Sequence, residues 1–230
     1  MPDDHAISRH LKSWEEVFAS RPWGRYPPEE LVRFMARQFG QVADKSAVKV
    51  LEIGCGPGAN LWFLAREGYA VGGIDGSPTA IQKAAERLRD DCPPLRVQPD
   101  LKVGNFGQLP WPDQAFDCVI DIEGISTNEL SVIRNAISEV HRVLKPGGRF
   151  FAKMFGTRTT GYDKGAEFEP GTLRNPKDGP CGGQDLAHYF TDKQLHQELA
   201  AFSALSLDSV VRSDHGGAWL VEEWLVQAQK

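Results

Sequence analysis

Short apolar segments alternate with helical patterns through the middle of this 230-residue chain, and no other feature constrains the fold as strongly. The apolar segments are 48–53, 70–75, 101–103, 116–121 and 149–155. Between them, apolar residues recur at helical spacing, most clearly at Leu130, Ile133, Ile137, Val140 and Leu144. Strands that alternate with helices form a parallel sheet covered on both faces. The sequence therefore predicts an α/β fold.

The last part of the chain departs from this alternation. Two strand-like segments, 205–212 and 218–228, are separated only by residues 213–217. A parallel crossover needs a dozen or more residues, so these two segments should pair as an antiparallel hairpin. Thr191 and Gln194 form a capping box, which predicts a helix just before the hairpin.

Composition and charge bound the class of protein. A 41% hydrophobic and 25% charged chain of this length is typical of one globular domain. No apolar run reaches the roughly 18 residues of a membrane span, and the first residues do not resemble a signal peptide. The four cysteines are scattered, without the spacing of a zinc site, which favours a reducing compartment. We therefore expect a cytoplasmic protein that needs no metal.

A glycine-rich loop, 54–58, lies between the first strand and the following helix. Glycines there allow a tight turn and close approach of a ligand, and the helix start offers free N–H groups. Asp75, at the end of the next strand, is placed to accept hydrogen bonds from ribose hydroxyls. Glu52 brings a carboxylate to the same place, which suits a cationic ligand better than a diphosphate. The loop predicts a nucleotide-like cofactor without specifying which one, and its glycine spacing disfavours NAD; the alternative is a plain turn in which Asp75 caps a helix.

Four segments resemble motifs of the class I S-adenosylmethionine (SAM)-dependent methyltransferases. They are Val50–Gly58, Gly73–Ser77, Leu109–Asp117 and His141–Gly148. The resemblance spans about residues 48–154 and implies a Rossmann-like three-layer sandwich around a seven-stranded, mostly parallel sheet that ends in the antiparallel hairpin. It also implies that SAM is the cofactor and S-adenosylhomocysteine (SAH) the product.

The resemblance implies a set of cofactor-binding residues. The glycine loop would pass under the methionine part and the ribose, Glu52 would face the amino end, and Asp75 would bind the ribose hydroxyls. The full set is Tyr26, Glu52, Gly54, Cys55, Gly56, Gly58, Asp75, Gly76, Ser77, Asn105, Phe106, Asp121 and Ile122.

Two groups of residues, one after the third strand and one at the end of the fourth, need comment. Asn105 and Phe106 stand where the family often has an acidic residue that accepts from the adenine amino group, and the Asn105 oxygen can still accept. Asp121, Ile122 and Glu123 end the fourth strand and should line the floor near the transferred methyl group, because open α/β sheets bind ligands at strand carboxyl ends.

The same resemblance divides the single domain into four parts. Residues 1–45 form an N-terminal helical lid, 46–155 the cofactor-binding core, 156–186 a substrate-loop insertion, and 187–230 the final helix and hairpin. The lid carries an aromatic cluster and the insertion is long for a connection, so both should shape the acceptor pocket. The expected substrate-binding residues are Trp14, Trp23, Glu123, Tyr162 and His188.

The expected reaction is metal-independent, in-line methyl transfer to the oxygen or nitrogen of a small-molecule or sugar-containing acceptor. His188, which follows the insertion, is the first candidate for a general base. A protein or tRNA acceptor is the alternative, although a net charge of −5 disfavours nucleic acid. A module that binds the cofactor without transferring its methyl group is an alternative of another class.

Overall fold

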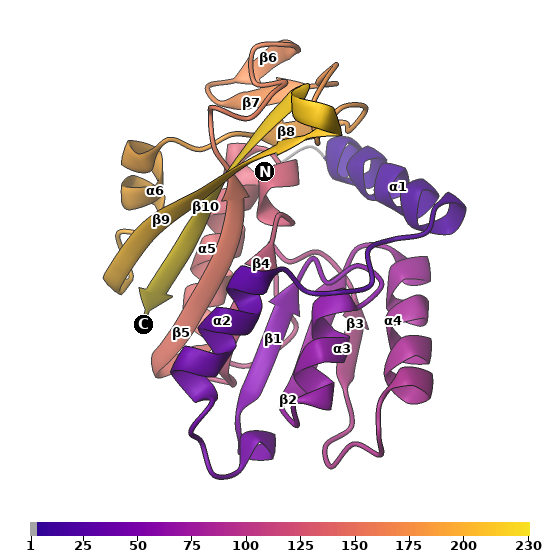
Figure 1. Ribbon diagram of the computed structural model, residues 1–230, viewed down its shortest axis with the longest axis vertical. Helices are drawn as coiled ribbons and strands as arrows, with labels where there is room; N and C mark the ends of the chain where they lie inside the picture. Colours follow the sequence, from indigo (N-terminus) through magenta and orange to yellow (C-terminus); the bar gives the residue numbers. More distant parts are fainter. Residues whose placement is uncertain (1–3) are drawn as a thin grey trace.

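The computed structural model describes residues 4–230, with side chains from residue 12 onward. Its main sheet has seven strands in the order β3-β2-β1-β4-β5-β10-β9 (Figure 1). Strands β1 to β5 are parallel, whereas β10 is antiparallel to both of its neighbours. The strands are β1 (Lys49–Ile53), β2 (Ala70–Asp75), β3 (Asp100–Val103), β4 (Phe116–Ile122), β5 (Leu144–Phe155), β9 (Ser203–Asp214) and β10 (Trp219–Gln229). The predicted α/β class, seven-stranded sheet and terminal hairpin are confirmed.

Helices cover both faces of this sheet. Helices α2 (Glu29–Phe39), α3 (Ala59–Arg66) and α4 (Pro78–Asp91) share one apolar core with the strands, and α5 (Leu130–Val143) and α6 (Asp192–Glu198) share the other. Three short 3-10 turns complete the described chain: η1 (Lys45–Ala47), η2 (Ile125–Thr127) and η3 (His215–Gly217). Within the described residues, none of the helices has the length and apolar character to span a bilayer.

The predicted lid, 1–45, divides into two parts with different positions. Helix α1 (Asp4–Ser20) lies at the end of the sheet where the parallel strands finish (Figure 1). Helix α2 instead packs on a face of the sheet, with Leu31, Phe34 and Met35 buried and the Phe34 ring stacked 4.7 Å from that of Phe151. Its apolar residues recur on one side of the helix, and burying that side against the sheet stabilises the fold.

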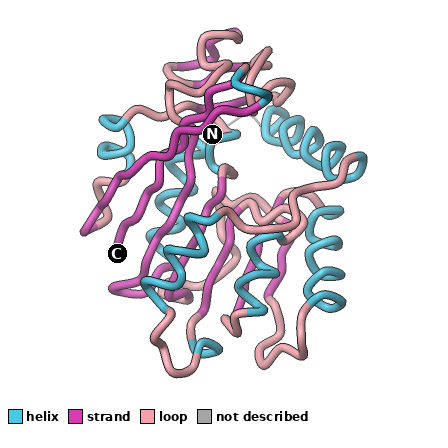
Figure 2. Tube along the Cα trace, in the orientation of Figure 1, coloured by secondary structure: helices cyan, strands magenta, loops and turns pink. Residues whose placement is uncertain are grey.

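The predicted insertion, 156–186, is an ordered element rather than an open loop. With the residues just after it, it forms a second, three-stranded antiparallel sheet of β6 (Ala166–Glu169), β7 (Thr172–Arg174) and β8 (Leu186–His188) (Figure 2). Phe155, Leu173, Cys181, Tyr189 and Val221 belong to a separate apolar cluster beneath this small sheet. That core explains its order, since a polar loop without one could not offset its loss of conformational entropy.

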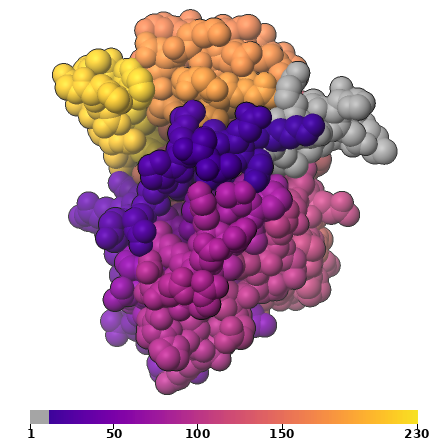
Figure 3. Space-filling view, turned by 90° about the vertical axis from the view of Figure 1, so that its right-hand side faces the viewer, coloured from indigo at the N-terminus to yellow at the C-terminus, as the bar shows by residue number. Residues whose placement is uncertain are grey.

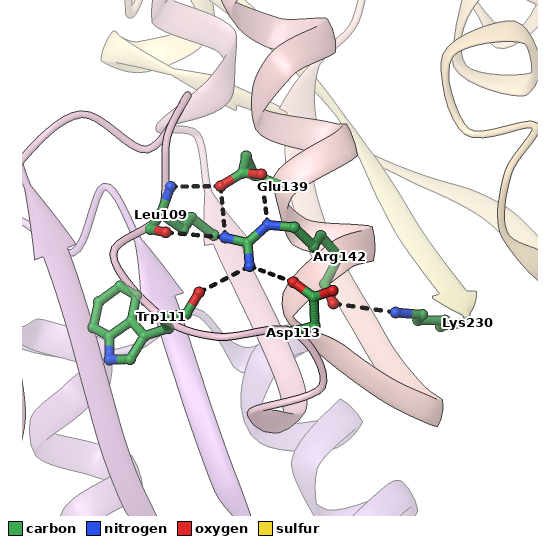
Figure 4. Close-up of polar contacts among 6 residues, drawn as sticks. All are labelled: Leu109, Trp111, Asp113, Glu139, Arg142 and Lys230. Carbon is green, nitrogen blue, oxygen red and sulfur yellow. Dashed lines mark hydrogen bonds and ion pairs between the residues drawn. The ribbon is translucent and has the colours of Figure 1, made fainter.

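Arg142, in the last turn of α5, fixes the long loop that leads into β4 (Figure 4). Its guanidinium donates to the carbonyl oxygens of Leu109 (3.0 Å) and Trp111 (2.8 Å), to Asp113 (2.8 Å) and to both oxygens of Glu139 (2.8 Å each). Glu139 in turn accepts from the Leu109 N–H at 2.7 Å. A planar fork of five donors suits this task because it serves carbonyl and carboxylate acceptors together.

We expect the substitution Arg142→Ala to lower the free energy of unfolding by about 2–3 kcal/mol, because the carbonyls and carboxylates lose charge-assisted hydrogen bonds. Arg134→Ala on the same helix is the matched control; its ion pair with Glu198 involves an exposed arginine, so the expected loss is below about 1 kcal/mol. Urea unfolding followed by circular dichroism measures both. Equal losses in the two variants would contradict the role given to Arg142.

Candidate functional site

A cavity of about 280 Å³ is lined by residues at the carboxyl ends of the parallel strands, on α1 and in the segment that carries the small sheet. In Figure 3 the indigo N-terminal segment lies between the orange residues, which include the small sheet, and the magenta residues of the first half of the main sheet and its helices. The volume is many times the ~30 Å³ of one water molecule and suits a small organic ligand. The structure places thirteen predicted site residues on its lining: Trp14, Trp23, Tyr26, Glu52, Gly54, Cys55, Gly56, Asp75, Gly76, Asn105, Phe106, Ile122 and Glu123.

The glycine loop owes its shape to left-handed backbone angles. Gly54, Gly56 and Gly58 have φ values of 63°, 49° and 79°, which other residues adopt only with strain. A Cβ atom at Gly58 would lie 2.9 Å from that of Ala84 on α4. Gly58 is not on the cavity lining, and the close packing of α3 on α4 explains why glycine stands there.

Asp75 holds the loop in place with its carboxylate. Its Oδ2 accepts from the Gly56 N–H at 2.8 Å and its Oδ1 from the Ser77 N–H at 2.9 Å. Burial raises the pKa of Asp75, and these two hydrogen bonds oppose that effect. Asp75 lies on the cavity lining and each of its oxygens keeps a further lone pair, so it can serve the loop and a ligand together. Ser77 itself is buried off the lining, where its Oγ caps α4 by accepting from the Ala80 N–H.

Glu52 and Asn60, both on the cavity lining, each have a buried oxygen without a hydrogen-bond partner among the described residues. The Asn60 amide donates to Glu52 Oε1 at 2.6 Å, while Glu52 Oε2 and Asn60 Oδ1 have no hydrogen-bond partner among the described residues. Burial raises the pKa of Glu52 well above its usual range. Buried acceptors without donors are costly, so this corner fits a ligand that brings N–H donors and positive charge, as the amino end of SAM would.

Three aromatic rings of the lid gather above the glycine loop. The Trp23 ring lies 5.9 Å from that of Trp14 and 5.1 Å from that of Phe18. A Cβ atom at Gly56 would lie 3.4 Å from the Phe18 ring, so the rings lie directly over the loop. Tyr26, at the end of this segment, packs edge-on against Trp62 of α3. The rings of Trp14, Phe18 and Trp23 therefore form an aromatic wall of the cavity over the glycine loop.

Glu15 fastens the lid to the first turn of α4. Its carboxylate accepts from the hydroxyl groups of Ser77 and Thr79 and from the Thr79 N–H at 3.2 Å. Hydrogen bonds from Ser77 and Thr79 lower the pKa of Glu15, and the positive end of the helix dipole favours the same ionised form. Lys83 adds a hydrogen bond to the Phe18 carbonyl oxygen at 2.6 Å.

Asn105 and Asp121 each have a structural partner. Asn105 Oδ1 accepts from the Gly107 N–H at 2.8 Å, which leaves it one lone pair for a ligand. Asp121 is fully buried and lies off the cavity lining; its Oδ1 accepts from the Ile125 N–H at 3.0 Å and so shapes η2. Burial raises the pKa of Asp121 to about 8.

The structure does not bring Tyr162 and His188 to the cavity lining. His188 is fully buried, with Nδ1 2.6 Å from the Thr172 hydroxyl and its ring 4.4 Å from that of Phe190. Strand β8 turns this ring into the interior, and burial lowers the pKa of His188, so the geometry gives no support for a general base there. Tyr162 packs edge-on against Tyr189 on the outside of the small sheet.

Several lining residues lay outside the sequence prediction. They are the polar groups Asn60, Thr127, Asn128, Glu129, Arg174, Gln184 and Asp185 and the apolar or thiol groups Phe18, Val132, Phe155, Pro180, Cys181 and Leu186. Asn60 lies two residues after the glycine loop, so the sequence alone could have identified it as a lining residue. The others depend on how η2 and the small sheet fold over the strand ends.

Comparison with known proteins supports the same family. Residues 50–148 match a methyltransferase domain family. A demethylmenaquinone methyltransferase of Tropheryma whipplei is 38% identical over 107 residues, which are 46% of this chain and 41% of that protein. A ubiquinone biosynthesis O-methyltransferase of Methylobacterium nodulans is 26% identical over 220 residues, covering 90% of this chain and 83% of the relative. The chain thus spans about two fifths of the first relative and most of the second.

Solved structures agree in fold. A SAM-dependent methyltransferase of Methanosarcina mazei aligns with a TM-score of 0.63 and 28% identity, over 79% of this chain and 92% of the other. The 1,6-didemethyltoxoflavin-N1-methyltransferase of Burkholderia thailandensis, solved with SAH, aligns over the whole chain and 91% of its own with a TM-score of 0.66; at 16% identity it supports the fold alone. The sheet order, the glycine loop and the match of residues 50–148 to a methyltransferase domain family thus agree with the resemblance to the class I SAM-dependent methyltransferases.

Proposed function

We propose that this protein transfers the methyl group of SAM to an oxygen or nitrogen of a small-molecule acceptor. The observation that carries the proposal is one continuous cavity whose lining includes both the glycine loop with Glu52 and Asp75 and, from later in the chain, Glu123, Phe155 and residues of the segment 174–186. A cofactor and an acceptor can therefore lie side by side, and such positioning supplies much of the rate of a transfer reaction.

The residues present fit SAM. Gly54 and Gly56 leave room for close approach, Asp75 keeps lone pairs for ribose hydroxyls, and Glu52 with Asn60 accepts from an amino group. When bound, SAM supplies an electrophilic methyl group on a positively charged sulfur. The aromatic wall of Trp14, Phe18 and Trp23 tolerates that charge and keeps water away from it.

The charge of the lining favours a neutral or cationic acceptor. Glu52, Asp75, Glu123, Glu129 and Asp185 contribute carboxylates to the described lining. Its one Lys or Arg side chain, Arg174, already pairs with Asp185 at 3.3 Å. An anionic acceptor such as a phosphate ester would meet repulsion there, whereas a hydroxyl or amine would not.

A small molecule is favoured over a macromolecule because α1 and the small sheet both border the cavity. The names of two relatives point the same way: one is a demethylmenaquinone methyltransferase and the other a ubiquinone biosynthesis O-methyltransferase. A tRNA acceptor would have to approach an acidic cavity on a chain of net charge −5.

Calorimetric titration of SAM, SAH and NAD, followed by a transfer assay with labelled SAM, tests the function. The acceptors are a catechol, a quinol, an aryl amine, total tRNA and a protein extract. Binding of SAM with transfer to a small molecule supports the proposal. Binding without transfer to any acceptor supports the cofactor-binding module, transfer only to tRNA or protein supports the macromolecular alternative, and binding of NAD alone overturns the assignment.

Replacing Asp75 by alanine should weaken SAM binding by about 1–3 kcal/mol, or about 5- to 150-fold in Kd, because the ribose loses its acceptor and the loop loses its hold on Gly56. Isothermal titration calorimetry measures the change. The control is Asp90→Ala, at an exposed residue paired only with its neighbour Arg89, which should bind normally. An unchanged Kd in the Asp75 variant would show that the ribose binds elsewhere.

Replacing Glu15 by alanine should loosen the lid, because the hydroxyl groups of Ser77 and Thr79 lose their shared acceptor. Trypsin cleavage after Lys12 and Arg21 should become faster, and SAH should slow it again. Glu16→Ala, at the exposed neighbouring position, is the matched control and should leave the rate unchanged. Similar cleavage in both variants would contradict the role of Glu15.

A further inference from the structure

The small sheet is attached to the start of α5 through the side chain of Glu169, the last residue of β6. Glu169 Oε1 accepts from the N–H of Leu130, the first residue of α5, at 2.5 Å. The same oxygen accepts from the hydroxyl of Thr172 on β7 at 3.0 Å. The N-cap residue of α5, Glu129, makes no side-chain capping hydrogen bond, so a carboxylate from another element serves the first N–H of the helix.

Thr172 extends this contact to His188 on β8. Thr172 Oγ1 lies 2.6 Å from His188 Nδ1, and both side chains are fully buried. A carboxylate can only accept, so the one hydroxyl proton of Thr172 goes to Glu169, and His188 Nδ1 must carry the ring proton. A proton on Nε2 instead would lie on a buried nitrogen that has no hydrogen-bond partner among the described residues.

These contacts form one chain of hydrogen bonds, which we call the relay. His188 donates to Thr172, Thr172 donates to Glu169, and the Leu130 N–H donates to Glu169 as well. Thr172 and His188 are cross-strand partners in the register of β7 and β8. Displacing one member would leave a buried donor or acceptor unpaired, so the relay fixes the small sheet relative to α5.

One end of the relay lies beside the cavity on the small sheet. Arg174 and Leu186 form the cross-strand pair two positions along from Thr172 and His188. Alternate residues of a strand point to the same face, so the two pairs share one face of the small sheet. Because Arg174 and Leu186 line the cavity, the relay holds the face that forms this part of the lining.

The other end of the relay lies beside the cavity on α5. Glu129 and Val132, which flank Leu130 in the chain, both line the cavity. Together with Arg174 and Leu186 they make up what we call the acceptor wall. The relay therefore joins the two halves of the acceptor wall, one on a helix and one on the small sheet.

We propose that Glu169, Thr172 and His188 are positioning residues that fix the acceptor wall and so determine the affinity for the methyl acceptor. The proposal rests on the proposed function and assigns the binding of the acceptor, rather than of SAM, to this wall. His188 acts through Thr172 and Glu169 without touching the acceptor, which gives a task to a histidine that lies off the cavity lining.

The physical reason is preorganisation. With the relay intact the acceptor wall holds its shape before the acceptor binds, so binding does not have to order the small sheet. Loss of the Thr172 hydroxyl leaves His188 and Glu169 without their shared partner, and acceptor binding then has to restore the wall. The site proposed for SAM is formed by the glycine loop, Glu52 and Asp75, so its affinity should not change.

The tautomer of His188 tests the relay without any ligand. Long-range proton–nitrogen correlation spectra at pH 7 distinguish a ring proton on Nδ1 from one on Nε2, and sequential assignment identifies the His188 signals. We expect the proton on Nδ1 in the wild-type protein and in Thr172→Ser, which keeps the hydroxyl. A proton on Nε2 in the wild-type protein overturns the proposal.

Thr172→Val removes the hydroxyl and keeps the shape of the side chain. With a catechol or aryl amine that the wild type methylates, it should raise the acceptor KM by about 10-fold, as expected for one buried hydrogen bond, with kcat and the Kd for SAM unchanged. Thr172→Ser should restore the wild-type KM. An unchanged acceptor KM in Thr172→Val overturns the proposal, and so does a Kd for SAM that weakens as much as the KM.

Glu169→Ala tests the other end of the relay. It should raise the acceptor KM as Thr172→Val does, and the double variant should be no worse than either single one, because the relay acts as a unit. Glu167→Ala, at an exposed position on the same strand, is the matched control and should leave the KM unchanged. Additive effects in the double variant overturn the proposal. Absence of methyl transfer by the wild type to any small-molecule acceptor overturns the proposed function instead, while the His188 tautomer still tests the relay itself.

Discussion

The two hydrogen bonds that the Asp75 carboxylate accepts, from the N–H groups of Gly56 and Ser77, are the constraint on which the site depends. They join the glycine loop after β1 to the start of α4 after β2. The start of α4 is also where Glu15 fastens the lid, through Ser77 and Thr79. One buried carboxylate therefore links the glycine loop to the start of α4, and a second lone pair on each of its oxygens remains for the ligand that we propose.

The features that the sequence predicted are those carried by short stretches of chain. Alternating apolar segments predicted the parallel strands, the short link 213–217 predicted the hairpin, and the glycine loop with Asp75 predicted the cofactor side of the cavity. His188 and Tyr162 were placed by their distance along the chain, but their positions depend on how the small sheet folds onto β10. The ion pair of Glu223 with Lys153 was missed for the same reason, because only the pairing of β10 with β5 brings these two residues together.

The polar groups on the cavity lining favour a ligand that carries positive charge. Glu52 Oε2 and Asn60 Oδ1 are buried acceptors without a hydrogen-bond partner among the described residues, and Glu129 and Asp185 add carboxyl groups to the lining. Buried acceptors carry a cost in the absence of a ligand, because they lack the water that would hydrogen-bond to them. A ligand with N–H donors and positive charge would relieve that cost. The site is thus organised for positive charge before any ligand arrives, which reduces the reorganisation needed on binding.

The cavity lining comes from two parts of the chain, one inside the family match and one beyond it. The family match ends at residue 148, before the carboxyl ends of β5 and β10 and before the small sheet. The chain up to that point carries the glycine loop and Asp75, whereas Phe155, Arg174 and Cys181 on the cavity lining lie beyond it. Exchange of the later segments could therefore reshape that part of the cavity while the glycine loop and Asp75 kept their geometry. The antiparallel β10 connects the two parts, because it pairs along β5 and its Val221 packs in the apolar cluster of the small sheet.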